Sequence, residues 1–395
     1  MLDYDKLLSD KAKQMKPSGI RKFFDVVATM DDVISLGVGE PDFQTPWLVR
    51  QTAIESLERK RMIYTANSGM AELRQEIARY VKRKYMLSYD PKTEIMVTVG
   101  GSEAIDLAIR SVVNPGDEVL VVEPSFVCYK PIVELMHGVA VPISTKLENK
   151  FKLTPEELQE HITDKTKMLI LPYPNNPTGG IMTRSDLEAI AEVLRGTDIF
   201  VLSDEIYSEL TYGVKHVSIA AIDGMRERTI YVSGFSKAFA MTGWRLGYFC
   251  APEPLAEQML KLHQYAIMSA PTLSQYVAIT ALRECDRDVE KMVAEYDSRR
   301  RMLVDGFNRI GLTCFYPEGA FYIFPCIRST GMNSEEFCEI LLQEEKVAVV
   351  PGNAFGDSGE GFIRVSYAYS LKHLQEALRR IDRFVKRHHD AGDKL

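Results

Sequence analysis

Short apolar runs alternate with longer segments of helical periodicity along most of the chain. The runs cover residues 94–99, 118–123, 167–173, 199–205, 229–234 and 245–251. Most of them are almost continuously apolar, which is typical of strands buried on both faces of a sheet. Between them, segments such as 102–113 and 183–196 repeat apolar residues at the i, i+3, i+4 spacing of an amphipathic helix. This alternation predicts an α/β fold with a mostly parallel central sheet and helices on both faces.

The pattern changes after the last of these runs. Residues 289–311 form a long, highly charged segment of helical periodicity, and a smaller strand-and-helix region follows it to the end of the chain. The first 45 residues contain no complete strand–helix–strand unit. We therefore predict a large domain over 46–285 and a small α/β domain over 286–395, with the segment 1–45 packing against the small domain.

Composition and charge argue against several classes of function. The 395 residues are 46% hydrophobic and 26% charged with a net charge of −7, so no basic footprint for nucleic acid or an anionic membrane is present. The charged start does not resemble a signal peptide, and no apolar stretch approaches the roughly 20 residues that span a bilayer. Six cysteines without a CxxC pair and seven histidines without metal-ligand spacing predict a cytoplasmic protein that holds no metal.

Polar and aromatic residues follow five of the predicted strands. They are Gly101 and Ser102, Phe126, Asn176, Asp204 with Tyr207, and Lys237. A single lysine after a strand is most often a solvated loop residue. However, the carboxyl ends of parallel strands meet at one edge of a sheet, where ligands of α/β proteins bind. We therefore expect a ligand site at this edge, where a glycine loop, an aromatic ring, an amide, a carboxylate with a phenol, and an amine come together.

The residue types at this edge select among cofactors. A Gly-Gly-Ser loop that opens a helix offers N–H groups to a phosphate, which Arg245 can also grip. The chain has no GxxxxGK[ST] motif, and GVGEPDF at 37–43 is not a complete GxGxxG, so nucleotide binding lacks its motifs. Pyridoxal 5′-phosphate, in contrast, requires a lysine that holds it as a Schiff base and a carboxylate beside its ring nitrogen. Lys237 and Asp204 suit these two roles.

The remaining residues of the edge suit the same cofactor. Asn176 and Tyr207 can hydrogen-bond its ring hydroxyl oxygen, and Phe126 can stack on the ring face.

Six motifs together resemble the class I and II aminotransferases that depend on pyridoxal phosphate. The motifs are SLGVGEPDF, YPNNPTG, LSDEIYSELTY, SGFSKAFAMTGWRLG, EGAFYIFP and FIRVSYA, and the resemblance extends from about residue 15 to residue 385. It implies the fold of these transferases. It also implies that the cofactor is bound by Lys237, Asp204, Asn176, Tyr207, Gly101, Ser102 and Arg245.

The resemblance also implies how substrate and a second subunit are bound. Arg364 matches the arginine that binds the substrate α-carboxylate. Gly39 matches a residue whose backbone contacts the substrate, and Asn176 is expected to contact the substrate as well. Tyr64 matches a tyrosine that reaches the phosphate of the neighbouring subunit. We therefore expect a homodimer with shared active sites.

The sequence departs from the family pattern at two positions. Many relatives carry Trp or Tyr where Phe126 stands, so the ring stack here has no polar group. Many also carry a phosphate-binding serine three residues before the lysine, where this chain has Gly234. Ser233 and Ser236 are the alternatives, of which we favour Ser236. Arg21 is a candidate for gripping a distal substrate group.

These residues predict a transaminase in which Lys237 is the general acid and base. The resemblance implies a ping-pong reaction of an amino acid with a 2-oxo acid: an aromatic, acidic or acetylated diaminopimelate donor with 2-oxoglutarate. The cofactor residues do not dictate which bond breaks, so a carbon–sulfur β-lyase on the same scaffold is an alternative. A ligand-sensing domain of a transcription regulator would need a DNA-binding segment, and the first 45 residues contain no helix-turn-helix or basic patch.

Overall fold

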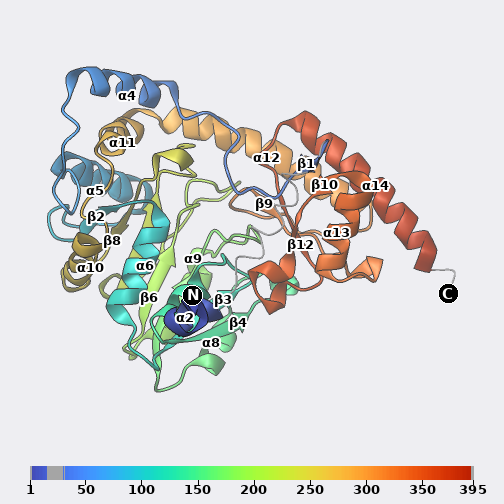
Figure 1. The fold of residues 1–395 in the computed structure, drawn as a ribbon, viewed down its shortest axis with the longest axis horizontal. Coiled ribbons are helices and arrows are strands. Elements are labelled where there is room, and N and C mark those ends of the chain that lie inside the picture. Colours follow the sequence, from blue (N-terminus) through green and yellow to red (C-terminus); the bar gives the residue numbers. More distant parts are fainter. Residues whose placement is uncertain (1, 16–29, 31, 393–395) are drawn as a thin grey trace.

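The computed structural model of the protein describes residues 2–15, 30 and 32–392. Within these ranges, seven strands form a central sheet in the order β2-β8-β7-β6-β5-β3-β4 (Figure 1). The strands are β2 (Ile95–Thr98), β3 (Glu118–Glu123), β4 (Val139–Ser144), β5 (Thr166–Leu171), β6 (Phe200–Asp204), β7 (Thr229–Gly234) and β8 (Gly247–Cys250). Strands β4, β3, β5, β6 and β7 pair in parallel, and β8 is antiparallel to both β7 and β2. The predicted mostly parallel sheet is confirmed, with a strand in each of the six predicted runs.

The apolar pattern did not predict β4. This strand lies at the edge of the sheet and pairs with β3 alone. Several of its side chains are exposed or half-buried, and it contains Pro142, which an edge strand tolerates because it has a free hydrogen-bonding side. A half-buried strand with a proline has no continuous apolar run to reveal it.

Helices cover both faces of the sheet, as predicted (Figure 1). One face packs against α6 (Gly101–Val112), α7 (Tyr129–Leu135) and α10 (Glu253–Ala266). The other packs against α5 (Ala71–Tyr85), α8 (Pro155–His161), α9 (Arg184–Leu194) and α11 (Thr272–Glu284). Successive residues of a strand face opposite sides, so Val201 of β6 lies in one core and Leu202 in the other. The near-continuous apolar strands follow from this double burial.

A smaller α/β region follows the sheet in the chain. It contains α12 (Asp286–Arg309), β9 (Tyr322–Ile323), α13 (Ser334–Glu345), β10 (Val347–Ala348), β11 (Val350–Pro351), β12 (Ile363–Ser366) and α14 (Leu371–Gly392). Strands β11, β12 and β9 form a small antiparallel sheet. Strand β1 (Ile34–Ser35), from the N-terminal segment, pairs in parallel with β10. The domain boundaries after residues 45 and 285 remain a prediction.

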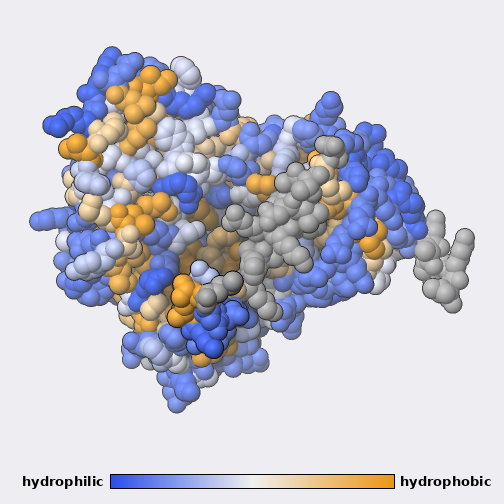
Figure 2. All heavy atoms as spheres, viewed as in Figure 1, coloured by the Kyte–Doolittle hydropathy of each residue, from blue (hydrophilic) through white to orange (hydrophobic). Residues whose placement is uncertain are grey.

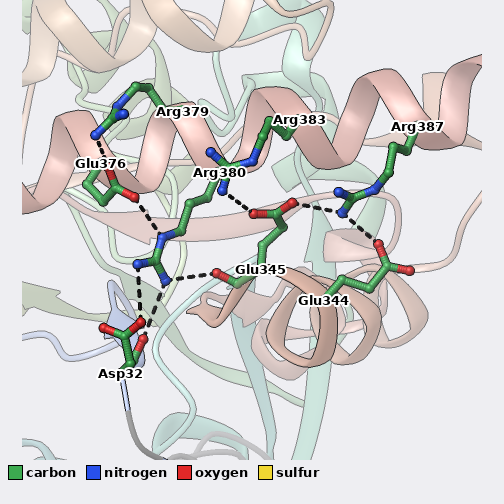
Figure 3. A network of polar contacts seen from close by, with 8 residues as sticks. All are labelled: Asp32, Glu344, Glu345, Glu376, Arg379, Arg380, Arg383 and Arg387. Atoms are coloured by element: carbon green, nitrogen blue, oxygen red, sulfur yellow. Dashed lines mark hydrogen bonds and ion pairs between the residues drawn. The ribbon is translucent and has the colours of Figure 1, made fainter.

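An ion-pair network joins this N-terminal segment to the C-terminal helices (Figure 3). Arg380 of α14 lies 3.6 Å from Asp32 and 2.9 Å from Glu376. The buried Glu345, at the end of α13, pairs with Arg383 and Arg387 of α14. These contacts hold α13, α14 and the entry to β1 together.

Three further helices lie nearer the N-terminus. They are α1 (Tyr4–Leu7), α2 (Asp10–Gln14) and α4 (Trp47–Arg59), the last of which packs on α11. Over the described ranges, no helix has the length and apolar character that crossing a membrane requires. In the same ranges, no group of three or more His, Cys, Asp or Glu side chains is arranged to hold a metal ion.

Candidate active site

A cavity of about 530 Å³ lies at the edge where β2, β3, β5, β6 and β7 end. The predicted site residues that line it are Gly39, Gly101, Ser102, Phe126, Asn176, Asp204, Tyr207, Ser236, Lys237, Arg245 and Arg364. Because β8 is antiparallel to its neighbours, its start lies at the same edge and brings Arg245 there. Topology therefore gathers side chains that are far apart in the sequence.

Asp204, at the end of β6, is a buried carboxylate held by two donors. The Tyr129 hydroxyl donates to Asp204 Oδ2 at 2.6 Å, and the Ile206 N–H donates to Oδ1 at 3.2 Å. Burial raises the pKa of the Asp204 carboxyl, although both hydrogen bonds oppose that rise. Within the described residues, no basic side chain forms an ion pair with it. A buried carboxylate with no basic partner among the described residues suits a cationic group bound in the cavity.

Lys237 follows β7 and extends into the same cavity. Its Nζ donates a hydrogen bond to the carbonyl oxygen of Gly39. The pKa of the Lys237 amine is lowered to about 8, mainly by burial and also by the nearby charges of Arg364 and Arg245, while Glu40 opposes the shift. A substantial fraction of the amine is therefore neutral, and so nucleophilic, near pH 7 to 8.

The loop before α6 is shaped for an anion. Gly100 has φ of +78°, and a Cβ there would lie 2.7 Å from Nη2 of Arg245, so the guanidinium rests against the loop. A Cβ on Gly247 would lie 2.4 Å from the Gly100 carbonyl carbon, so β8 approaches the loop backbone directly. Helix α6 begins at Gly101, and its first N–H groups and the positive end of its dipole favour an anion at this end.

The two candidate serines, at the end of β7 and just after it, have different surroundings. Ser236 lines the cavity, whereas Ser233 lies within β7 and its hydroxyl donates to the Glu205 carbonyl at 3.4 Å. A Cβ on Gly234 would lie 3.0 Å from the Gly247 Cα, so any side chain there would crowd β8. This close approach favours glycine at position 234.

Arg364, from β12, is a buried cation on the opposite wall. The side chain donates from Nη1 to Asn176 Oδ1 at 2.8 Å and from Nη2 to the Gly37 carbonyl, while its Nε has no hydrogen-bond partner in the described structure. The guanidinium lies 4.6 Å from the Tyr322 ring centroid. Burial lowers its pKa, and no carboxylate of the described chain pairs with it. The site therefore has an unused cationic group for a carboxylate.

Two tyrosines connect the walls. The hydroxyls of Tyr207 and Tyr322 lie 2.9 Å apart, and both side chains are buried. A Cβ on Gly39 would lie 2.3 Å from the Tyr322 hydroxyl, so Gly39 permits the backbone to pass there. Sequence reasoning missed Tyr322 and Tyr129. Tyr322 lies inside the quoted EGAFYIFP motif, and Tyr129 begins the helix three residues after Phe126.

Comparison with known proteins identifies the family. The family model "Aminotransferase class I and II" matches residues 31–381. The chain is 54% identical to the YugH protein of Bacillus subtilis and 46% identical to an aspartate aminotransferase of Pyrococcus abyssi, each over 96% of this chain and 98% of the relative. A solved aromatic aminotransferase of Pyrococcus horikoshii superimposes with a TM-score of 0.88 at 44% identity, covering 93% of this chain and 99% of that one. The chain belongs to the class I and II aminotransferases.

The described residues fit pyridoxal phosphate, on which this aminotransferase family depends. The cavity contains a buried amine of lowered pKa, a buried carboxylate without a cationic partner and an anion-binding helix start beside an arginine. The Asn176 amide nitrogen remains free to donate because its oxygen accepts from Arg364. Phe126 is half-buried and forms an edge-to-face contact with the Tyr129 ring, with centroids 6.0 Å apart.

Two sequence candidates of this aminotransferase lie elsewhere. Tyr64 is 79% exposed and does not line its own chain's cavity. Arg21 lies outside the described residues.

Proposed function

We propose that this aminotransferase moves the amino group of an L-amino acid to 2-oxoglutarate in two half-reactions of a ping-pong cycle. The observation that carries the proposal is Arg364. A buried guanidinium that faces the Lys237 cavity and has no carboxylate partner among the described residues suits the α-carboxylate common to amino acids and 2-oxo acids.

Each side chain of the site has a proposed task. When bound, the cofactor supplies an electron sink for the electron pair left on the substrate α-carbon. Lys237 Nζ would take the proton from the α-carbon of the amino acid in the first half-reaction and give a proton to the α-carbon derived from the oxo acid in the second, and its lowered pKa suits a base near neutral pH. Asp204 holds a proton on the ring nitrogen, and Tyr129 orients the carboxylate. Arg364 fixes the α-carboxylate so that the reacting C–H bond faces Lys237.

The cofactor is held at its other positions by residues of the same edge. Asn176 and Tyr207 would donate to the ring hydroxyl oxygen, and Phe126 would lie against the ring face. Gly101, Ser102, Ser236 and Arg245 would bind the phosphate, and Gly39 would contact substrate through its backbone.

We propose a donor of the aromatic, acidic or acetylated diaminopimelate class. The names of the Pyrococcus relatives support the first two classes. The residues assigned above contact the parts that all amino acids share, so the donor is to be found by measurement. A spectrophotometric scan should add each candidate alone to the loaded enzyme. We expect the donor to bleach the cofactor band stoichiometrically without an oxo acid, and 2-oxoglutarate to restore it.

The same assay separates the alternative activity. A carbon–sulfur lyase would release pyruvate and ammonia from an S-substituted cysteine in repeated turnovers without any oxo acid. Such turnover, without a bleaching donor, would overturn the proposal. A requirement for both substrates before any bleaching would contradict the ping-pong order.

We further propose that the enzyme is a homodimer with shared sites. Large exposed apolar side chains gather on α4 and the segment after it, including Trp47, Ile54, Leu57 and Ile63, and Figure 2 shows apolar atoms over α4 on the face in view. An apolar patch on a soluble protein marks an interaction surface. Tyr64 adjoins this patch, so a second copy docked there would receive its hydroxyl.

Mixed dimers test the shared site. The Tyr64→Ala and Lys237→Ala homodimers should each be poorly active. In a mixed dimer, the subunit that keeps Lys237 receives an intact Tyr64 from its partner, so one site is native. Mixed dimers isolated with two affinity tags should regain activity up to one native site per dimer. No recovery would mean that Tyr64 does not act across the interface.

A further inference from the structure

An acidic side chain lies directly behind the loop that we assign to the phosphate. Glu103 follows Ser102 in the first turn of α6 but does not line the cavity. Its Oε2 accepts the Val99 N–H at 2.5 Å, so the side chain folds back over the start of the loop. Glu103 thus connects the end of β2 to the beginning of α6.

This position raises an electrostatic problem. The start of α6 favours negative charge, and Glu103 already uses that preference. A phosphate at the same helix start would bring up to two further negative charges beside it, and like charges at short range disfavour binding unless a cation compensates. Arg245 lies on the cavity side of the loop, against Gly100. A second positively charged group is therefore needed on the side of the loop where Glu103 lies.

His263 provides that compensation. It is fully buried in the last turn of α10, and its Nδ1 lies 2.5 Å from Glu103 Oε1. The C-terminal end of α10 and the Glu103 carboxylate both place negative electrostatic potential around the His263 ring. The Nε2 atom of His263 has no hydrogen-bond partner in the described structure.

We propose that Glu103 and His263 form a positioning pair for the phosphate of the cofactor, in which Glu103 holds the loop and His263 neutralises Glu103. The inference rests on the proposed phosphate site and extends it to residues that do not touch the ligand. The pair should strengthen the binding of a ligand that carries the phosphate, and it should have little effect on the binding of the ring alone.

The test compares pyridoxal phosphate with pyridoxal, which is the same ring without the phosphate. Both are titrated into apoenzyme and followed by absorbance. His263→Asn keeps a neutral donor near Nδ1 but cannot carry charge. We expect it to weaken pyridoxal phosphate binding about tenfold or more and to change pyridoxal binding by less than about twofold. Adding Glu103→Gln to this variant removes the uncompensated charge and should restore most of the lost affinity.

A single Glu103→Gln variant covers the case in which His263→Asn does not fold. The glutamine oxygen can still accept from the Val99 N–H, and one negative charge beside the phosphate is gone. Its affinity for pyridoxal phosphate, relative to pyridoxal, should equal or exceed that of the wild type. A lower relative affinity would overturn the charge argument.

Two further variants serve as controls. His216→Asn alters another buried histidine–carboxylate pair, with Glu205, on the face of the sheet away from α6, so it should leave the ratio of the two affinities unchanged. Arg245→Leu removes a direct phosphate ligand and should reduce the ratio strongly. Equal weakening of both ligands by His263→Asn would overturn the positioning pair while the phosphate site stands. An unchanged ratio in Arg245→Leu would instead overturn the phosphate site and the inference with it.

Discussion

The two walls of the cavity are built in different ways. One wall, here the cofactor wall, comprises Gly101, Ser102, Asp204, Ser236, Lys237 and Arg245. It is formed by loops at the edge of one sheet, whose strands other than β4 are largely buried on both faces. The other wall, here the substrate wall, comprises Gly37 to Glu40, Tyr322 and Arg364. It is formed by an extended segment and two short strands that come from opposite ends of the chain.

The contacts that hold the two walls differ in the same way. Asp204 is held by Tyr129 and Ile206, which belong to the same sheet-and-helix unit. Arg364 is held by Gly37 and Asn176, which lie 327 and 188 residues away in the chain. The sheet edge places the loops of the cofactor wall, with Lys237 also bonded to Gly39 of the substrate wall, whereas the substrate wall depends on the packing of remote segments. We therefore expect cofactor-wall changes to affect chemistry and cofactor state, and substrate-wall changes to affect substrate affinity.

The largest effect should come from Lys237→Ala on the cofactor wall. The base that moves the α-proton is lost while phosphate and ring contacts remain, so turnover should fall about a thousandfold or more. The protein should still bind the cofactor, but without a covalent link. Steady-state rates and denaturing mass spectrometry check both points. A variant that retains more than about a thousandth of wild-type turnover would contradict the role of Lys237 as base.

Asp204→Asn should lower turnover on the order of a hundredfold or more, because an amide cannot hold a proton on the ring nitrogen. The visible spectrum of the bound cofactor should change with it. If rate and spectrum both remain those of the wild type, Asp204 only supports the fold.

Arg364→Leu tests the substrate wall. Because the α-carboxylate is common to all substrates, the KM should rise for every amino acid and oxo acid, and kcat/KM should fall on the order of a hundredfold. The cofactor spectrum should stay that of the wild type. A loss confined to dicarboxylic substrates would move Arg364 to a distal side-chain pocket.

A matched pair of hydroxyl deletions compares the walls directly. Tyr129→Phe leaves the buried Asp204 side chain with one donor fewer and should lower kcat about tenfold. Tyr322→Phe removes a neutral hydrogen bond to Tyr207 and should cost about threefold, mainly in KM. Steady-state kinetics of the two variants with one donor settle the comparison. Equal effects on kcat would show that the walls are not separable.

A further prediction concerns pH. With the pKa of the Lys237 amine at about 8, the neutral fraction rises as pH increases through that value. The rate at which apoenzyme captures pyridoxal phosphate should therefore rise about fivefold from pH 7 to pH 8. Arg364 lowers this pKa, so Arg364→Leu should shift the midpoint to higher pH. A midpoint that does not move would mean that the substrate wall has no electrostatic influence on Lys237.

The sheet and the cofactor wall could be predicted from the amino-acid sequence alone. Doubly buried strands leave continuous apolar runs, and loops after parallel strands share one edge, so the sequence pattern is enough to group Asp204, Asn176 and Lys237. The edge strand β4 was not predicted, because several of its side chains are exposed and Pro142 interrupts its apolar run.

The contacts that complete the site depend instead on tertiary packing. Tyr129 reaches Asp204 because α7 packs on the face of the sheet toward which Asp204 points, and His263 reaches Glu103 because α10 packs on α6. Gly234 is a glycine because β8 passes close to it. None of these contacts follows from local periodicity. They arise where elements distant in sequence pack together, and their geometry is set by packing rather than by any one segment.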